Sequence, residues 1–152
     1  MVAWQRAADL LDAANAILAV ERSRLAPLLA PSTWELVLTG GSSVAGALTK
    51  GDVDLHLRVE AVGFVPCVAA LRGIYEVVLP EIWQDTLATY EVPGAPLPTG
   101  VAVTPIGSAH DVRFRRSWEL LAADPDLLAA YNAMKLAGGD KSAFFDRLMA
   151  SS

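Results

Sequence analysis

Polar and apolar residues alternate most regularly between Val53 and Val59. One side of this segment carries Val53, Leu55, Leu57 and Val59, and the other carries Asp52, Asp54, His56 and Arg58. A period of two over this length predicts a β-strand with one buried face and one solvent-exposed face. Residues 34–39 have a similar β-rich pattern, and residues 87–92 and 100–104 predict two further strands joined by a proline-rich loop.

Helical spacing appears in the remaining segments. Apolar side chains recur at positions i, i+3, i+4 and i+7 within residues 3–21, which predicts an amphipathic helix with Pro27 and Pro31 marking its exit. A short helical turn is expected at 43–49 and a helix at 64–71. Asp124 followed by Pro125 is a typical helix start, and Gly138 a typical stop, with a last helix at 141–149.

These elements predict an α+β fold, with a small mixed β-sheet, helices packed on one face, and a polar face left for chemistry. We expect a single domain spanning 1–152, with an N-terminal helix at about 3–21, a core at about 34–106 and C-terminal helices at about 117–149. The chain has 152 residues, of which 53% are hydrophobic, and this composition excludes a disordered chain.

Composition and charge narrow the function classes. No apolar run is long enough to span a membrane and no basic segment opens the chain, so we expect a cytoplasmic protein. The net charge of −5 argues against broad, non-specific nucleic-acid binding, although it does not exclude a nucleic acid. A single cysteine, Cys67, excludes an intramolecular disulfide and a cysteine zinc cluster.

The turn Gly40-Gly41-Ser42-Ser43 follows the strand at 34–39 and carries no bulky side chain. Backbone N–H groups at such a turn favour a phosphate group, particularly where a helix begins. Taken alone, a Gly-Gly-Ser segment is more often only a turn. We therefore interpret it together with the acidic strand that follows.

Asp52 and Asp54 lie two residues apart on a predicted strand, so both carboxylates face the same side, with backbones roughly 6–7 Å apart. Two like charges this close favour a cation between them. Mg²⁺ binds a few protein carboxylates together with substrate phosphate oxygens. The segment therefore predicts a Mg²⁺ (or Mn²⁺) site beside a phosphate-binding turn, and metal-assisted nucleotidyl transfer as its chemistry. A solvated strand face is the structural alternative for the Asp pair alone.

Other nucleotide-binding and metal-binding motifs match this sequence less well. Ala47 and Leu48 stand where a P-loop requires Lys and Ser or Thr. A zinc site formed by His56 and His110 with one of the aspartates is conceivable, but two histidines in separate elements are a weak signal.

The hydrophobic-Gly-Gly-Ser turn followed by Asp-hydrophobic-Asp resembles the signature of the nucleotidyltransferase (DNA polymerase beta-like) superfamily. Within it, residues 34–149 are similar to the GrpB-like proteins. The resemblance rests on Ser43-Val44-Ala45-Gly46, on Lys50 before the acidic strand, on the segment from Asp124-Pro125 to Tyr131 and Lys135, and on Lys141. The superfamily usually supplies a third carboxylate from a later strand, and residues 100–104 contain none. Glu91 is a candidate substitute and Asp111 a weaker one.

The resemblance implies a Mg²⁺-dependent enzyme that binds an NTP, with ATP expected, and transfers a nucleotidyl group to an acceptor that the sequence does not name. Asp52 and Asp54 are the expected catalytic residues and metal ligands. The expected nucleotide- and phosphate-binding residues are Gly40, Gly41, Ser42, Ser43, Lys50, Tyr131 and Lys135. Candidate substrate contacts are His56, Arg58 and Glu91.

Each of the less specific positions also has a purely structural interpretation. Lys50 is equally well a surface lysine. Tyr131 and Lys135 share a helical face, which also suits a core tyrosine beside a lysine that reaches solvent.

Two other function classes stay open from the sequence. One is a non-catalytic nucleotide- or partner-binding module of the same fold, favoured by the missing third carboxylate. The other is a structural or interaction protein, for example a homodimer formed through apolar helices.

Overall fold

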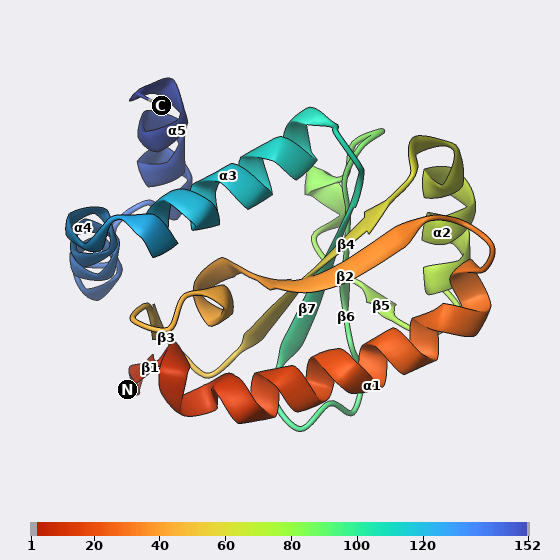
Figure 1. Ribbon diagram of the computed structural model, residues 1–152, viewed down its shortest axis with the longest axis horizontal. Coiled ribbons are helices and arrows are strands. Elements are labelled where there is room, and N and C mark those ends of the chain that lie inside the picture. Colours follow the sequence, from red (N-terminus) through yellow and green to blue (C-terminus); the bar gives the residue numbers. More distant parts are fainter. Residues whose placement is uncertain (1–2, 152) are drawn as a thin grey trace.

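The computed structural model describes residues 3–151, and its central element is a mixed β-sheet (Figure 1). The strand order in this sheet is β2-β4-β7-β6-β5. The strands are β2 (Trp34–Thr39), β4 (Val53–Val59), β5 (Glu76–Val77), β6 (Ala88–Glu91) and β7 (Thr99–Pro105). β4 and β7 run parallel, and the other neighbours are antiparallel. A small second sheet pairs β1 (Gln5–Arg6) with β3 (Leu48–Thr49).

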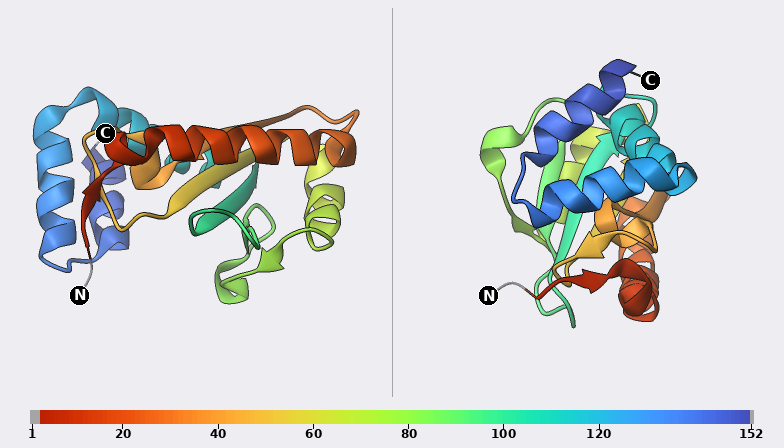
Figure 2. Two further views of the ribbon diagram at one scale, coloured as in Figure 1. Left: turned by 90° about the horizontal axis from the view of Figure 1, so that it is seen from below. Right: turned by 90° about the vertical axis from the view of Figure 1, so that its left-hand side faces the viewer.

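The helices cover the sheet unequally. The helices are α1 (Leu11–Leu29), α2 (Phe64–Leu71), α3 (Ala109–Ala123), α4 (Pro125–Leu136) and α5 (Lys141–Ser151). Short 3-10 turns include η1 (Ala7–Leu10), η2 (Gly40–Ser43), η3 (Ala61–Gly63) and η4 (Pro80–Ile82). α1 and α2 pack on one face of the sheet, where the apolar side of β4 forms the main core with them. Figure 2 shows α4 and α5 gathered at one end of the molecule.

A second apolar cluster lies at that end. It consists of Val44, Ala47, Trp118, Leu121, Tyr131 and Phe145. These residues come from the loop after η2 and from α3, α4 and α5, so the C-terminal helices pack against the same turn that precedes the acidic strand.

Most of the predicted elements are confirmed. The α+β class with a small mixed sheet is confirmed, as are the strands at 34–39 and 53–59 with their buried side at Val53, Leu55, Leu57 and Val59. α4 begins after Asp124, whose carboxylate accepts hydrogen bonds from the N–H groups of Asp126 and Leu127. Within residues 3–151, no helix is both long and apolar enough to cross a bilayer.

The predicted N-terminal helix at 3–21 is wrong in its bounds. Gln5 and Arg6 pair with Thr49 and Leu48 as a strand, so the helix starts only at Leu11. It continues through Pro27 to Leu29. Leu29 is almost completely buried against the sheet core, and this burial offsets the backbone hydrogen bond that proline removes.

Two further expectations differ from the structure. The predicted helical turn at 43–49 is instead the 3-10 turn η2 followed by the strand β3. The C-terminal helices begin at Ala109 rather than near 117, because Ser108 caps α3 by accepting a hydrogen bond from Asp111 N–H at 3.3 Å.

The polar face of β4 is not uniformly wet. His56 is only 1% exposed, because α3 lies over this part of the sheet and Phe114 packs against the imidazole with ring centroids 4.9 Å apart. The period-two pattern correctly separated the two faces, but it could not show that a helix distant in sequence covers half of the polar one.

Candidate functional site

Asp54 lies at the start of β4, between two glycines. A Cβ added at Gly40 would collide with Oδ2 of Asp54, and one added at Gly100 would lie 3.8 Å from Oδ1. Its carboxylate is half-buried and receives no hydrogen bond from residues 3–151. Burial raises the pKa of Asp54, and the neighbouring charge of Asp52 raises it further, whereas Lys141 and Lys135 lower it. This carboxylate is therefore poorly compensated within the protein.

Hydrogen bonds of the Ser42 side chain hold the glycine-serine turn η2 against the acidic strand β4. Its hydroxyl donates to the carbonyl of Thr39 at 2.8 Å and accepts from the N–H of Asp54 at 3.1 Å. Ser43 donates to the carbonyl of Gly40 at 2.7 Å. Both hydroxyls thus shape the turn itself, and Gly40 adopts the left-handed conformation, with φ of 62°, that brings the turn against Asp54.

Asp52 lies beside Asp54 but is exposed to solvent. Its carboxylate accepts one hydrogen bond, from the hydroxyl of Thr49 at 3.3 Å. The two carboxylates are close enough for Asp52 to raise the pKa of Asp54. The structure therefore places both predicted carboxylates in one neighbourhood, next to Gly40.

Lysines lie near this acidic pair: Lys141 and Lys135 are close enough to lower the pKa of Asp54, and Lys50 stands two residues before Asp52 in the chain. Lys50 and Lys135 both lie over the ring of Trp4, at 5.5 Å and 5.4 Å from its centroid. Lys141, at the start of α5, lies 5.5 Å from the centroid of Trp118. Burial lowers the pKa of Lys135, and the charge of Lys141 lowers it further, while the two aspartates raise it. A concentration of positive charge of this kind suits a polyphosphate.

Tyr131 lies on the inner side of the same turn. It is fully buried, and its hydroxyl is the one buried side-chain polar atom of residues 3–151 without a hydrogen-bond partner. A Cβ added at Gly41 would lie 3.8 Å from this hydroxyl. Burial raises the pKa of Tyr131, and the charges of Asp54 and Asp52 add to the effect, so the hydroxyl stays protonated and can donate.

A cavity of about 580 Å³ opens next to Asp54. It lies between the sheet, α3 and α5. Its polar and charged lining includes Thr39, Asp54, Thr89, His110, Arg113, Ser117, Lys141 and Ser142. In the sequence, Lys141 stands out only through the GrpB resemblance, His110 only as a weak zinc candidate, and Arg113 only as part of a basic run. Their gathering beside Asp54 depends on how α3 and α5 pack, and only the basic character of residues 110–116 gave a sequence signal for it.

Other predicted residues lie apart from Asp54. His56 is within hydrogen-bond distance of the Thr104 hydroxyl, at 2.8 Å. Arg58 donates two hydrogen bonds to the carboxylate of Asp111, at 2.6 Å and 3.0 Å. Asp111 is completely buried and also accepts from the N–H of Gly107, so it anchors the start of α3. Its interactions are those of a structural carboxylate.

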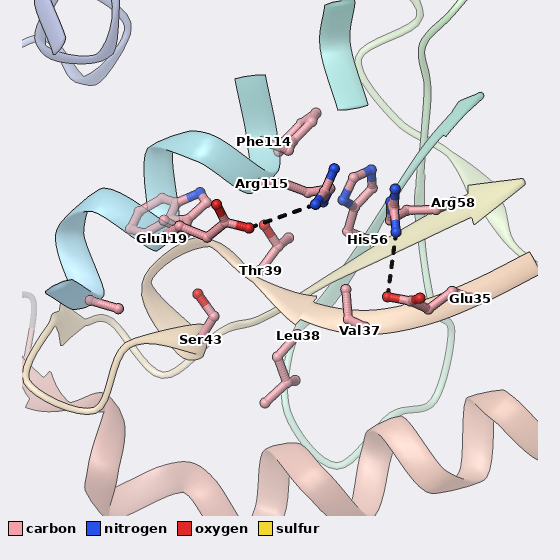
Figure 3. Close-up of a pocket in the computed structure, with 12 residues that line it drawn as sticks. Glu35, Val37, Leu38, Thr39, Ser43, His56, Arg58, Phe114, Arg115 and Glu119 are labelled. Atoms are coloured by element: carbon pink, nitrogen blue, oxygen red, sulfur yellow. Dashed lines mark ion pairs between the residues drawn. The ribbon is translucent and has the colours of Figure 1, made fainter. Parts of the chain in front are cut away.

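Figure 3 shows a second cavity, of about 310 Å³, on the other side of α3. His56 and Arg58 face it from β4, with Phe114 and Arg115 above. Two ion pairs cross its borders, Arg58 with Glu35 at 3.6 Å and Arg115 with Glu119 at 3.8 Å. Its charged groups therefore neutralise one another.

Glu91, the candidate third carboxylate, lies on β6 and is exposed. It pairs in register with Gly100, which in turn pairs with Asp54. Two strand spacings separate Glu91 from Asp54, roughly 10 Å. On β7, the strand next to Asp54, positions 100 and 102 are Gly and Ala. Within residues 3–151, no group of three or more His, Cys, Asp or Glu side chains is placed to hold a metal ion.

The residues present nevertheless fit a hard divalent cation that is shared with a ligand. Asp54 offers carboxylate oxygens without a hydrogen-bond donor from residues 3–151, and Asp52 offers a second, exposed carboxylate. Mg²⁺ prefers such oxygens and usually takes its remaining ligands from water and phosphate. The arrangement suits one cation bound with a phosphate ligand, rather than a cage made by the protein alone.

Comparison with solved structures identifies the fold. GrpB from Enterococcus faecalis matches with a TM-score of 0.69 at 16% sequence identity, over 91% of this chain and 92% of that one. The poly(U) polymerase Cid1, solved with MgGTP bound, matches with a TM-score of 0.51 at 15% identity. A Cid1 variant bound to MgATP matches with a TM-score of 0.52 at 14% identity. The nucleotidyltransferase fold expected from the sequence is confirmed.

The matches to GrpB and to Cid1 cover different shares of the solved chains. The matches to Cid1 cover 78% and 79% of this chain but only 39% of Cid1. No protein-family model matches the sequence, and no curated protein matches it either.

Proposed function

We propose that this protein binds an NTP, ATP in the first instance, together with Mg²⁺ or Mn²⁺, and transfers its nucleotidyl group to an acceptor. The observation that carries the proposal is the half-buried carboxylate of Asp54, which receives no hydrogen bond from residues 3–151, lies against Gly40 and is close to Lys141 and Lys135. The nucleotide complexes known for Cid1, which shares the fold, support the same ligand class.

Asp52 and Asp54 would hold the cation. A cation held by these two carboxylates would supply positive charge that neutralises the charge developing on the phosphate in the transfer. Lys50, Lys135 and Lys141 would bind and orient the remaining phosphate oxygens. In the transfer, an acceptor oxygen forms a bond to the α-phosphorus, the bond from that phosphorus to the next bridging oxygen breaks, and pyrophosphate leaves with the electron pair.

Tyr131 would donate the hydrogen bond that it does not make within residues 3–151. Its hydroxyl lies close to Gly41, 3.8 Å from where a Cβ would be, and therefore next to the turn where the phosphates would lie. Ser42 and Ser43 would act by holding the turn, because their hydroxyls are engaged with its backbone.

The experiment is a thermal-shift screen of the four NTPs with and without Mg²⁺. A ligand at about 100 times its Kd stabilises the folded state by about 2.7 kcal/mol, which raises the melting temperature by several degrees. We expect MgATP to give this shift in the wild type, Asp54→Asn to abolish it and Asp52→Asn to reduce it.

Asp12→Asn is the matched control, because Asp12 is exposed on α1 and makes no contact with the site. It should keep the full shift. A shift that is unchanged in Asp54→Asn would contradict the proposal, whatever the variant's own melting temperature.

A second candidate function is nucleotide binding without turnover. It is favoured by β7, where Gly100 and Ala102 leave no third carboxylate beside Asp54. Pyrophosphate release distinguishes the two: the catalytic proposal requires release that depends on Mg²⁺ and on Asp54, whereas a binding module shows the thermal shift and no release.

A further inference from the structure

The three lysines of the proposed phosphate site lie against aromatic rings and not against carboxylates. Lys50 and Lys135 lie over the ring of Trp4, and Lys141 lies over the ring of Trp118. Within residues 3–151, none of the three forms an ion pair with an Asp or Glu side chain. An aromatic ring attracts a cation without cancelling its charge, as a paired carboxylate would. These lysines are therefore held in place and still carry charge for an anionic ligand.

Trp4 differs from Trp118 in what else it contacts. Trp118 belongs to the second apolar cluster, whereas Trp4 belongs neither to the main core nor to that cluster. The ring of Trp4 is half-buried, and its contacts with cations are those with Lys50 and Lys135. A contribution of Trp4 to the site therefore acts through these two lysines rather than through the packing of the core.

The pairing of β1 with β3 places Trp4 next to this site. Gln5 pairs with Thr49 in an antiparallel register, so Trp4 and Lys50 come next along the two strands. Lys135 reaches the same ring from α4, with its ammonium group 5.4 Å from the centroid. One indole ring thus joins a lysine that precedes the acidic strand to a lysine of the C-terminal helices.

The ring keeps two like charges close to each other. Burial and the charge of Lys141 lower the pKa of Lys135, and the charge of Lys50 adds to this effect. An anion that contacts both ammonium groups relieves their repulsion, and a polyphosphate has enough charged oxygens to do so. A lysine has three N–H donors, of which Lys135 uses one on the carbonyl of Leu48. Donors therefore remain for phosphate oxygens while the ring contact is kept.

We propose that Trp4 is a positioning residue for the proposed nucleotide site: it orders Lys50 and Lys135 to bind the polyphosphate of the NTP, and it does not stack on the base. The inference rests on the proposed function. A free lysine loses side-chain freedom when it binds a phosphate, and a lysine that already lies on a ring loses less. Trp4 therefore increases the affinity for the phosphates without touching them.

Calorimetric titration of the full chain with MgATP and with Mg-tripolyphosphate tests the inference. Tripolyphosphate has no base, so it reports phosphate binding alone. Trp4→Leu should weaken the binding of both ligands by about fivefold or more, and by the same factor, because two lysines lose the ring that orders them. Trp4→Phe keeps a ring with a weaker quadrupole, so it should weaken binding only by about twofold.

Trp34→Leu is the matched control. Trp34 is also half-buried, but it pairs with Val59 at the end of β4 opposite to Asp54. This variant should keep the affinity for both ligands, whatever its effect on stability. In a Lys50→Gln background, Trp4→Leu should have a smaller effect than in the wild type, because one of the two lysines it orders is gone. An equal effect in both backgrounds would assign Trp4 a merely structural role and overturn the inference.

NMR gives a second measurement if Trp4→Leu does not fold. The indole N–H resonance of Trp4, assigned by its loss in Trp4→Phe, should shift when Mg-tripolyphosphate binds the wild type. The ε-methylene resonances of Lys50 and Lys135 should shift with it. Resonances that stay unchanged at saturation would overturn the inference.

The outcomes separate this inference from the proposed function. A loss of affinity confined to MgATP would mean that Trp4 stacks on the base, and unchanged affinities in Trp4→Leu would mean that the lysines do not need the ring. Either result overturns the inference and leaves the proposed function intact. A failure of MgATP to bind even the wild type overturns the proposed function instead.

Discussion

At the scale of single residues, Gly40 and Asp54 depend on each other. Gly40 has φ of 62°, and its missing side chain leaves the space that the Asp54 carboxylate occupies. Gly94 has a similar φ of 73°, yet a Cβ there would meet nothing within 4 Å. Substituting each glycine by alanine therefore separates the free-energy cost of backbone strain, which both variants have, from the cost of a steric collision, which only the Gly40 variant has.

We predict that Gly94→Ala lowers the free energy of unfolding by about 1 kcal/mol, from backbone strain alone. Gly40→Ala should cost at least about 1 kcal/mol more, because Asp54 must also move. Urea denaturation measures both values. Gly40→Ala should in addition lose the MgATP-induced thermal shift, which Gly94→Ala should keep. Equal costs for the two variants would show that the turn can move away from Asp54 without strain.

His56 shows how burial changes a residue that the sequence places on a polar face. Burial lowers its pKa to about 4, and Arg58 and Arg115 act in the same direction, while Asp111 opposes them. The unfolded chain, with an ordinary pKa of 6.5, binds a proton more readily than the folded protein between pH 4 and 6.5. Stability therefore falls as the pH falls through this window.

The expected loss from His56 is about 3 kcal/mol between pH 7 and pH 4. His56→Gln should remove this part of the pH dependence in urea denaturation series. Burial raises the pKa of Asp111, but Arg58 and Gly107 lower it by more, so Asp111 adds a further loss of stability below about pH 4. The pKa of Asp54 is raised, so its effect on stability has the opposite sign. His110→Gln controls for the loss of a histidine. An identical slope in wild type and His56→Gln would contradict the prediction.

At the scale of elements, α4 holds the loop between η2 and β3 in place. Asn132 accepts a hydrogen bond from the N–H of Leu48 at 2.9 Å and donates to the carbonyl of Gly46 at 3.0 Å. Lys135 donates to the carbonyl of Leu48 at 3.3 Å. A helix near the C-terminus thus fixes the chain just before Lys50 and Asp52.

We predict that Asn132→Ala lowers stability by about 1–2 kcal/mol, because two backbone groups of the loop lose their partner. The amide of Leu48 should exchange its hydrogen faster, as NMR can measure. Asn15→Ala, on the exposed side of α1, should change neither quantity. Unchanged exchange at Leu48 would mean that the pairing of β3 with β1 is sufficient to hold the loop.

At the scale of the whole molecule, the site joins two apolar clusters. Asp54 belongs to the sheet, which packs with α1 and α2, while Tyr131, Lys135 and Lys141 belong to the helices of the second cluster. Tyr131 lies at the centre of that second cluster, with Trp118, Phe144 and Phe145 rings within 6 Å, at centroid distances of 5.3 Å, 5.8 Å and 5.8 Å. A ligand that contacts both groups should therefore couple them.

We predict that saturating MgATP slows hydrogen exchange in α4 and α5 at least tenfold, because any opening that separates them from the sheet also destroys the binding site. Local openings of α2, at the other end of the sheet, should be unaffected. Asp54→Asn should abolish the protection. Protection confined to β4 and η2 would show that the C-terminal helices do not take part in binding.

The sequence alone determined the parts of the site that depend on local order. Strands at 34–39 and 53–59, the turn at 40–43 and the start of α4 follow from side-chain periodicity, glycine conformation and helix capping, which act over a few residues. The likeness to GrpB confirms the nucleotidyltransferase fold that the family resemblance of the sequence implied.

Only the tertiary structure decided which polar residues have access to solvent and which come together. His56 is buried because α3 packs over that part of the sheet, and Lys141 lies near Asp54 because α5 packs at the same end. Glu91 lies two strands from Asp54 because β7 pairs between β4 and β6. Packing between elements distant in the chain follows from their shapes and apolar faces. It leaves no period in the sequence, so neither the cavity beside Asp54 nor the Tyr131 hydroxyl without a partner in residues 3–151 could be predicted from it.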